Sequence, residues 1–149
     1  MPYYDVDPLI GIGPVRLGMT RDEVLAAMGE QPRTFRKTPL STHEADAFRG
    51  ASFQVFYSGD TPRVEYIELS RRAQMKPRYR GISVFETPAE QLVELISRDA
   101  PYDAARREIP DSYIFPTLEL SLWRPHGEGE AGRFFSTVGI GDRGYYSNP

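Results

Sequence analysis

Two short stretches, Thr20-Arg21-Asp22-Glu23 and Thr87-Pro88-Ala89-Glu90, decide the fold expected of this chain. Each has the spacing of a capping box. In that motif the threonine hydroxyl bonds the backbone amide of the glutamate, and the glutamate side chain bonds the amide of the threonine. The first stretch predicts a helix over residues 21–28, ended by Gly29 in a left-handed conformation. The second predicts a helix from 88 to about 98, with its proline at the first helical position.

The two threonines stand 67 positions apart, and the same offset relates the segments around them. Apolar residues alternate before and after each helix, and the matching pairs are Val15-x-Leu17 with Ile82-x-Val84, Phe48 with Phe115, Phe53-x-Val55 with Leu120-x-Leu122, and Phe56 with Trp123. This self-similarity predicts two tandem repeats within one domain of 149 residues. Repeat one covers about 9–70, a basic linker covers 71–80, and repeat two covers about 81–144.

Each predicted repeat is a strand, a helix and further strands. Alternation in 52–57 and in 64–70, with turn residues between them, predicts a β-hairpin, and 117–124 with 133–140 predicts its counterpart. This pattern favours the α+β class: two strand-helix-strands repeats forming one antiparallel sheet with both helices on one face. The other face of such a sheet can meet solvent or a partner.

The composition narrows the class of protein. With 40% hydrophobic and 26% charged residues and a net charge of -3, the chain is globular and mildly acidic, which argues against a nucleic-acid partner. It has no cysteine, which excludes thiolate chemistry and disulfides. No apolar run is long enough for a membrane span and no signal peptide is visible, so we expect a cytoplasmic protein with no membrane partner.

The stretch Gly18-Met19-Thr20, followed by Val24, Met28-Gly29 and Pro32, resembles the signature of the SmpA/BamE-like domains. The tandem form is similar to the β-lactamase inhibitory proteins. This resemblance implies two helix-plus-sheet repeats that bind an enzyme through an aromatic sheet face. The opening from Gly11 to Thr20 also loosely resembles immunity-type proteins of bacterial toxin systems. The inhibitory proteins carry disulfides and the assembly lipoprotein carries a lipidated cysteine, both of which a chain without cysteine lacks.

Residues that could carry catalysis are few. His43 lies beside Glu44 and Asp46, and His126 precedes Glu128 and Glu130, but neither forms a recognisable catalytic or metal motif. Residues 139–144 match Gly-x-Gly-x-x-Gly without the helix that a dinucleotide site needs, so we expect these glycines to form a turn. The sequence therefore predicts no enzyme, no catalytic residue, no cofactor and no metal.

Side-chain alternation predicts which residues lie on the sheet face away from the helices. The expected helix-facing residues are Phe53, Val55, Ile67, Leu69, Leu118, Leu120, Leu122, Phe134, Val138 and Ile140. The opposite face then receives the candidate protein-binding residues Phe56, Tyr66, Glu68, Glu119, Trp123 and Phe135. Tryptophan and tyrosine are enriched in interface hot spots. The alternative is that loops or termini, including Tyr3, Tyr4, Tyr145 and Tyr146, cover this face as a second core layer.

The leading hypothesis is a protein-binding module, an immunity-type inhibitor of a bacterial toxin or enzyme. A domain that binds or converts a small molecule, in the pocket between sheet and helices or at the His43 cluster, is the alternative from another class. An assembly or chaperone module of the SmpA/BamE type is the third. Exposed sheet edges would also allow a homodimer.

Overall fold

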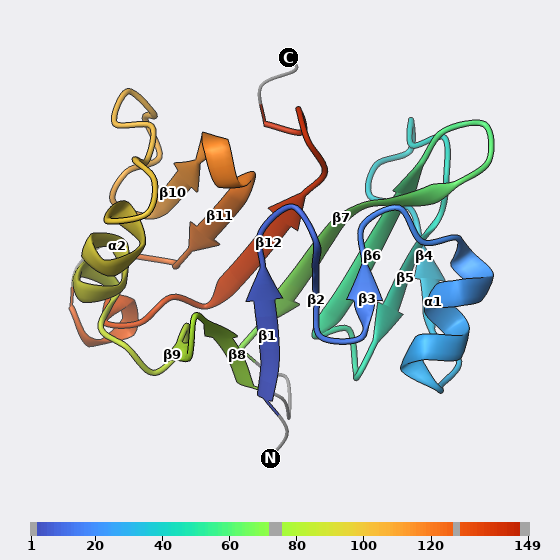
Figure 1. The fold of residues 1–149 in the computed structure, drawn as a ribbon, viewed down its shortest axis with the longest axis horizontal. Helices are drawn as coiled ribbons and strands as arrows, with labels where there is room; N and C mark the ends of the chain where they lie inside the picture. The colour runs from blue at the N-terminus through green and yellow to red at the C-terminus, as the bar shows by residue number, and fades with distance from the viewer. Residues whose placement is uncertain (1–2, 72–75, 127–128, 147–149) are drawn as a thin grey trace.

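The computed structural model describes residues 3–71, 76–126 and 129–146. Within these residues the chain forms twelve β-strands in two sheets and two α-helices (Figure 1). The larger sheet is antiparallel throughout. Its seven strands, in spatial order, are β10 (Ser112–Phe115), β11 (Leu120–Trp123), β12 (Thr137–Gly141), β7 (Arg63–Ser70), β6 (Phe53–Ser58), β5 (Ala45–Phe48) and β4 (Arg33–Phe35).

The smaller sheet lies across one face of the larger one, with β1 and β8 in front of its central strands in Figure 1. Its order is β3 (Val15–Arg16), β2 (Gly11–Ile12), β1 (Tyr3–Asp7), β8 (Lys76–Tyr79) and β9 (Ile82–Ser83). Strand β1 is antiparallel to β2 and parallel to β8, so it joins two short hairpins into one sheet. We call the face of the larger sheet under this layer the inner face, and the opposite one the outer face.

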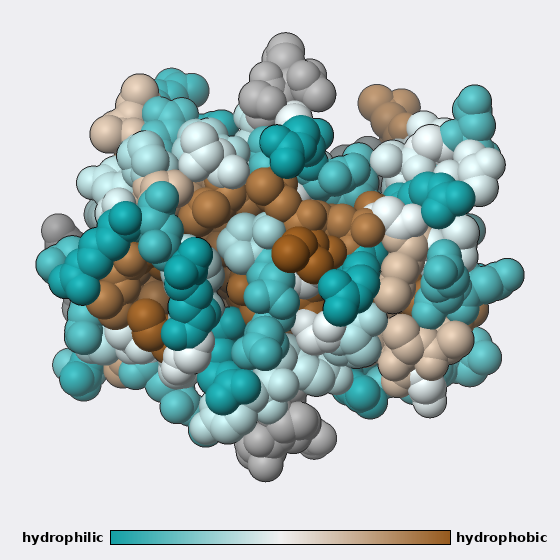
Figure 2. All heavy atoms as spheres, in the orientation of Figure 1, coloured by the Kyte–Doolittle hydropathy of each residue, from teal (hydrophilic) through white to brown (hydrophobic). Residues whose placement is uncertain are grey.

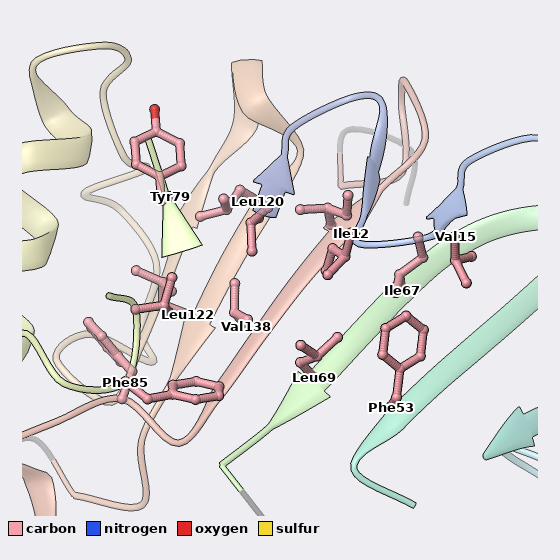
Figure 3. Packing of buried hydrophobic residues seen from close by; sticks show 14 of the residues in the cluster. Ile12, Val15, Phe53, Ile67, Leu69, Tyr79, Phe85, Leu120, Leu122 and Val138 are labelled. Carbon is pink, nitrogen blue, oxygen red and sulfur yellow. The ribbon is translucent and has the colours of Figure 1, made fainter. Parts of the chain in front are cut away.

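The main core fills the space between the two sheets. Figure 3 shows Ile12 and Val15 of the smaller sheet near Phe53 and Ile67 of the larger one, and all four side chains are fully buried. Burying an apolar side chain of this size contributes about 1.5–3 kcal/mol. The same cluster includes Val24 and residues from both helices, so one core connects every layer.

Helix α1 (Arg21–Met28) forms as predicted, with the predicted bounds. The backbone N–H of Glu23 donates to the Thr20 hydroxyl over 3.3 Å, and the Thr20 N–H donates to a Glu23 carboxylate oxygen over 3.0 Å. The same carboxylate oxygen also accepts the Thr20 hydroxyl over 3.1 Å, and the two bonds that it accepts lower the pKa of Glu23 because they favour its charged form. Gly29 ends the helix with φ 68°, a conformation that suits glycine.

Helix α2 (Ala89–Ser97) begins differently, and the second predicted capping box is wrong. Pro88 is the N-cap, with ψ 137°, and no side chain caps the helix. A residue that precedes proline is kept out of the helical region, so Thr87 lies before the cap, in the bend that follows β9, and does not join the helix. The first free amide, that of Ala89, instead donates to the carbonyl of Arg133 over 2.9 Å.

The predicted fold class is also wrong. The protein is not one sheet with two helices on one face; it is largely β, with a second sheet and only two short helices. The prediction failed because two-residue strands such as β2 and β9 carry too little alternation to be recognised. Residues 76–79, within the segment predicted as a linker, are strand β8 and pair with β1. The linker residues 72–75 lie outside the described residues.

Several elements recur at the offset of 67 residues. Strand β3 at 15–16 matches β9 at 82–83, β5 at 45–48 matches β10 at 112–115, and β6 and β11 begin at 53 and 120. Strands β7 and β12 pair at the centre of the larger sheet, flanked by β6 and β11. The two-repeat organisation stays a prediction, which these positions support. Neither described helix is long and apolar enough to cross a membrane.

Candidate protein-binding interface

The outer face is a grid of side chains ordered by the strand registers. Residues directly opposite one another on neighbouring strands form three rows across the sheet. The first row contains Gly141, Tyr66 and Phe56; the second contains Ile114, Ser121, Gly139, Glu68, Gln54 and Ala47; the third contains Ser112, Trp123, Thr137 and Ser70. We call the first row the tyrosine end and the third row the tryptophan end.

The C-terminal residues 142–146 cover the tyrosine end. The ring of Tyr145 stacks on that of Tyr66, with centroids 4.7 Å apart. The Tyr146 hydroxyl donates to the Ser121 hydroxyl over 2.7 Å, and burial raises the pKa of Tyr146 to about 12. Phe56, Tyr66 and Ala45 form a small second cluster with these tyrosines. At this end the C-terminal part of the alternative describes the arrangement. Its N-terminal part is wrong, because Tyr3 and Tyr4 lie in β1 of the smaller sheet and Tyr4 packs edge-on against Phe53 of the inner face.

Glu119 anchors this covering segment. Its two carboxylate oxygens accept the backbone N–H groups of Gly144 and Tyr146 over 3.1 and 2.8 Å. Glu119 is buried in a left-handed turn at φ 50°, just before β11. The predicted binding residue is therefore occupied by contacts within the chain.

The glycine motif at residues 139–144 makes room for aromatic rings. Gly139 and Gly141 lie inside β12, so the predicted turn at these two glycines is wrong. A Cβ on Gly139 would stand 1.9 Å from the Tyr66 hydroxyl oxygen, and one on Gly141 would stand 2.5 Å from the Cβ of Tyr145. The strand can hold no side chain at these two positions because Tyr66 and Tyr145 occupy the space that a Cβ would need.

Glu68 lies in the middle row, half-buried between Gln54 and Gly139. Burial raises the pKa of Glu68, and the charge of Lys37 offsets part of this effect. The Lys37 ammonium lies 5.0 Å from the ring centre of Phe56 and 5.6 Å from that of Tyr66. The carboxylate thus borders an aromatic surface that already carries a cation.

The tryptophan end is open. Trp123 is 46% exposed, which is rare for so large an apolar side chain. Backbone hydrogen bonds of 2.8 Å link Ser136 to Trp123 and Arg71 to Ser136, so these segments are neighbours. Beside them, the guanidinium groups of Arg71 and Arg133 each lie 5.2 Å from the ring centre of Phe134.

Phe135 was predicted on the wrong face. It is fully buried in the main core of the inner face, edge-on to Tyr113, whereas Phe134 is only half-buried and lies outside that core. The prediction extended the alternation of Val138 back along the chain, but β12 begins only at Thr137. Outside a strand the backbone no longer alternates, so the two phenylalanines exchange places.

The six predicted residues therefore separate into distinct environments. Phe56 and Tyr66 are buried under the C-terminal segment, Glu68 is half-buried, and only Trp123 is exposed. The other helix-facing predictions hold for Phe53, Val55, Ile67, Leu69, Leu120, Leu122, Val138 and Ile140, while Leu118 is half-buried at the edge of the same core. The arginine-flanked Phe134 was missed. The sequence signal for it was Arg133-Phe134-Phe135 beside a loop.

The described residues contain no group of three His, Asp or Glu side chains that could hold a metal ion. Comparison with known proteins finds no match: no family model, no curated protein and no solved structure is similar to this chain. The resemblance to the SmpA/BamE-like and inhibitory proteins stays a hypothesis from the sequence.

Proposed function

We propose that this chain is a protein-binding module that receives its partner at the tryptophan end of the outer face. The observation that carries the proposal is the exposed Trp123 at the end of β11, close to a phenylalanine whose ring centre lies 5.2 Å from each of two guanidinium groups. Tryptophan and arginine dominate interface hot spots because they bury much surface with few rotatable bonds. Strand β11 fixes the backbone of Trp123 before binding, which reduces the entropy lost on association.

The charge of this region indicates the chemistry of the partner. Arg71 and Arg133 form no ion pair with any residue that the structure describes. Their guanidinium groups can each accept a bidentate carboxylate. We therefore propose a partner with acidic side chains around an apolar pocket for Trp123. A bacterial toxin or enzyme inhibited in the cytoplasm is the partner class that the sequence resemblance suggests.

The test uses candidate partners from the host and four forms of the protein. Trp123→Ala should weaken binding by about 2 kcal/mol, roughly 30-fold. Arg71→Glu should weaken it more strongly at low salt than at high salt. The matched control is Tyr3→Ala, an aromatic residue of similar exposure (49%) on β1 of the smaller sheet. We expect this control to bind like the wild type.

Thermal unfolding of the same variants completes the test. We expect Trp123→Ala to leave the melting temperature nearly unchanged. If Trp123→Ala binds the partner normally but unfolds at a much lower temperature, Trp123 is a core residue and the proposed interface is wrong. A second copy of the chain as the sole binder would indicate a homodimer, formed through edge strands β4 or β10.

A further inference from the structure

A cleft of about 500 Å³ lies between the connection from β4 to β5 and the β6–β7 hairpin. Phe56 and Ala45, which are 8% and 2% exposed, form part of its wall. A second cleft of about 710 Å³ adjoins it and shares Thr42, His43 and Tyr57 with it. Volumes of this size are typical of small-molecule sites, which combine apolar walls with a few polar groups. The tryptophan end of the outer face contributes nothing to its lining.

Four charged or titratable side chains of both signs line this cleft. Lys37 and His43 come from the β4–β5 connection, while Asp60 and Glu65 come from the hairpin. None of the four forms an ion pair with another residue within 3–71, 76–126 and 129–146. One ammonium group and two carboxylates thus face one cavity without forming an ion pair with each other, which leaves both signs of charge available to a ligand.

The backbone aims Glu65 at this cleft. The register between β6 and β7 shifts at Phe56 and Tyr57, so that Tyr57 pairs with Val64 and Glu65 has no partner across the ladder. A bulge of this kind bends the strand and redirects a side chain, and bulges are frequent beside functional sites. Lys37 is held too, since its ammonium lies 3.3 Å from the Tyr145 hydroxyl and over two aromatic rings.

We infer that this cleft binds a small zwitterion with an apolar group, of which a free α-amino acid is the simplest example. Its ammonium group would meet Asp60 and Glu65, and its carboxylate would meet Lys37 and an N–H of His43. The apolar side chain would rest against Phe56 and Ala45. A ligand that lacks the ammonium group leaves Asp60 and Glu65 without a partner, and one that lacks the carboxylate leaves Lys37 and His43 without one. The site should therefore prefer ligands that carry both charges.

Calorimetric titration of the full chain with three matched probes tests this inference. The probes are L-phenylalanine, phenethylamine, which lacks the carboxylate, and 3-phenylpropionate, which lacks the ammonium. We expect saturable binding of L-phenylalanine and at least tenfold weaker binding of each single-charge probe, the loss expected for a missing charge-assisted hydrogen bond. These three titrations use only the wild-type protein, so they do not depend on a variant folding.

Variants then locate the site. Glu65→Gln and Lys37→Gln should each weaken L-phenylalanine binding about tenfold. Glu44→Gln removes the same charge as Glu65→Gln, but Glu44 lies in the β4–β5 connection and lines only the second cleft, so this variant should bind like the wild type. Absence of saturable L-phenylalanine binding, equal binding of the three probes, or a loss in Glu44→Gln equal to that in Glu65→Gln overturns the inference. Trp123→Ala should leave this binding unchanged, which separates the outcome from that of the proposed partner interface.

Discussion

Arg124 is a buried charge that ties three segments of the chain together. It is 1% exposed, and its guanidinium donates to the carbonyls of Pro110 and Gly132 over 2.8 Å each. It also lies over the ring of Phe135 and forms an ion pair of 3.0 Å with Glu90 at the start of α2. Because Glu90 is 71% exposed, water screens that ion pair, and the carbonyl hydrogen bonds should dominate the stabilisation.

Substitutions of Arg124 and of Glu90 should therefore lower the free energy of unfolding by unequal amounts. Arg124→Met should lower the free energy of unfolding by about 3 kcal/mol, since the buried Gly132 carbonyl and the partly buried Pro110 carbonyl both lose a charged donor. Glu90→Gln should cost less than about 1 kcal/mol. Urea denaturation of both variants measures the difference. Equal losses in the two variants would contradict this account and assign the stabilisation to the ion pair.

Glu68 should make stability depend on pH. Burial raises its pKa in the folded state, so the folded protein holds this proton more tightly than the unfolded chain. The stabilisation from that proton is present at pH values below the unfolded pKa and is lost as pH rises through the folded pKa. Glu68→Gln, which cannot ionise, should therefore unfold at a higher temperature than wild type at pH 7.

The gain in Glu68→Gln should amount to at most about 1 kcal/mol, because the side chain is only half-buried. It should disappear near pH 3, where the wild-type carboxyl is protonated. Thermal unfolding at the two pH values checks this, with exposed Glu44→Gln as the control. A gain of the same size at pH 3 would show that charge is not its cause.

At the scale of elements, the two helices start by different physical means. Helix α1 is capped within its own sequence by Thr20 and Glu23. Helix α2 has no side-chain cap, and its Ala89 amide depends on the carbonyl of Arg133, more than forty residues later in the chain. Local sequence therefore specifies where α1 begins, while the start of α2 is fixed only when the second half of the chain has folded.

Substituting alanine for Thr20 and for Thr87 should reveal this difference between the two helices. Thr20→Ala should cost about 1 kcal/mol of stability, the usual value of an N-cap hydroxyl. Thr87→Ala should change stability by no more than about 0.5 kcal/mol, because its hydroxyl makes no cap. Chemical denaturation of the pair provides the measurement. A loss of about 1 kcal/mol at both positions would show that Thr87 caps α2 in solution.

At the scale of the whole molecule, one core joins both sheets and both helices. Strand β1 is central to this arrangement, because it pairs with both hairpins of the smaller sheet and buries Val6 in the core. If either sheet unfolded, the apolar side chains that the other sheet contributes to this core would be exposed to water. We therefore expect the sheets to unfold together in a single cooperative transition.

Two probes can follow this transition separately. The fluorescence of Trp123, the one tryptophan of the sequence, reports on the larger sheet, and NMR amide signals of Ile12 and Val15 report on the smaller one. Their urea midpoints should coincide. Val6→Ala deletes two buried methyl groups. It should lower both urea midpoints by the amount that corresponds to a loss of about 2 kcal/mol in the free energy of unfolding. Separate midpoints would mean that the sheets are independent folding units.

Local signals determined a large part of this structure. Helix α1 and the β6–β7 hairpin follow from short motifs: a capping box, a glycine stop, and alternation around a turn. The inward positions of Val55 and Leu122 and the outward position of Trp123 follow from the same alternation. These features are readable because hydrogen bonds and side-chain directions over a few residues depend on those residues alone.

Only the tertiary structure decided the remaining features. The second sheet needs β1 to pair with β8 some seventy residues away, and such short strands gain their stability from the surface they cover rather than from their own pattern. The burial of Phe135, the tyrosines over Gly139 and the charged cleft at Lys37 arise in the same way. Each depends on which distant segments meet in space. The free energy that stabilises these arrangements comes from contacts between such segments, and no local stretch of sequence contains both sides of those contacts.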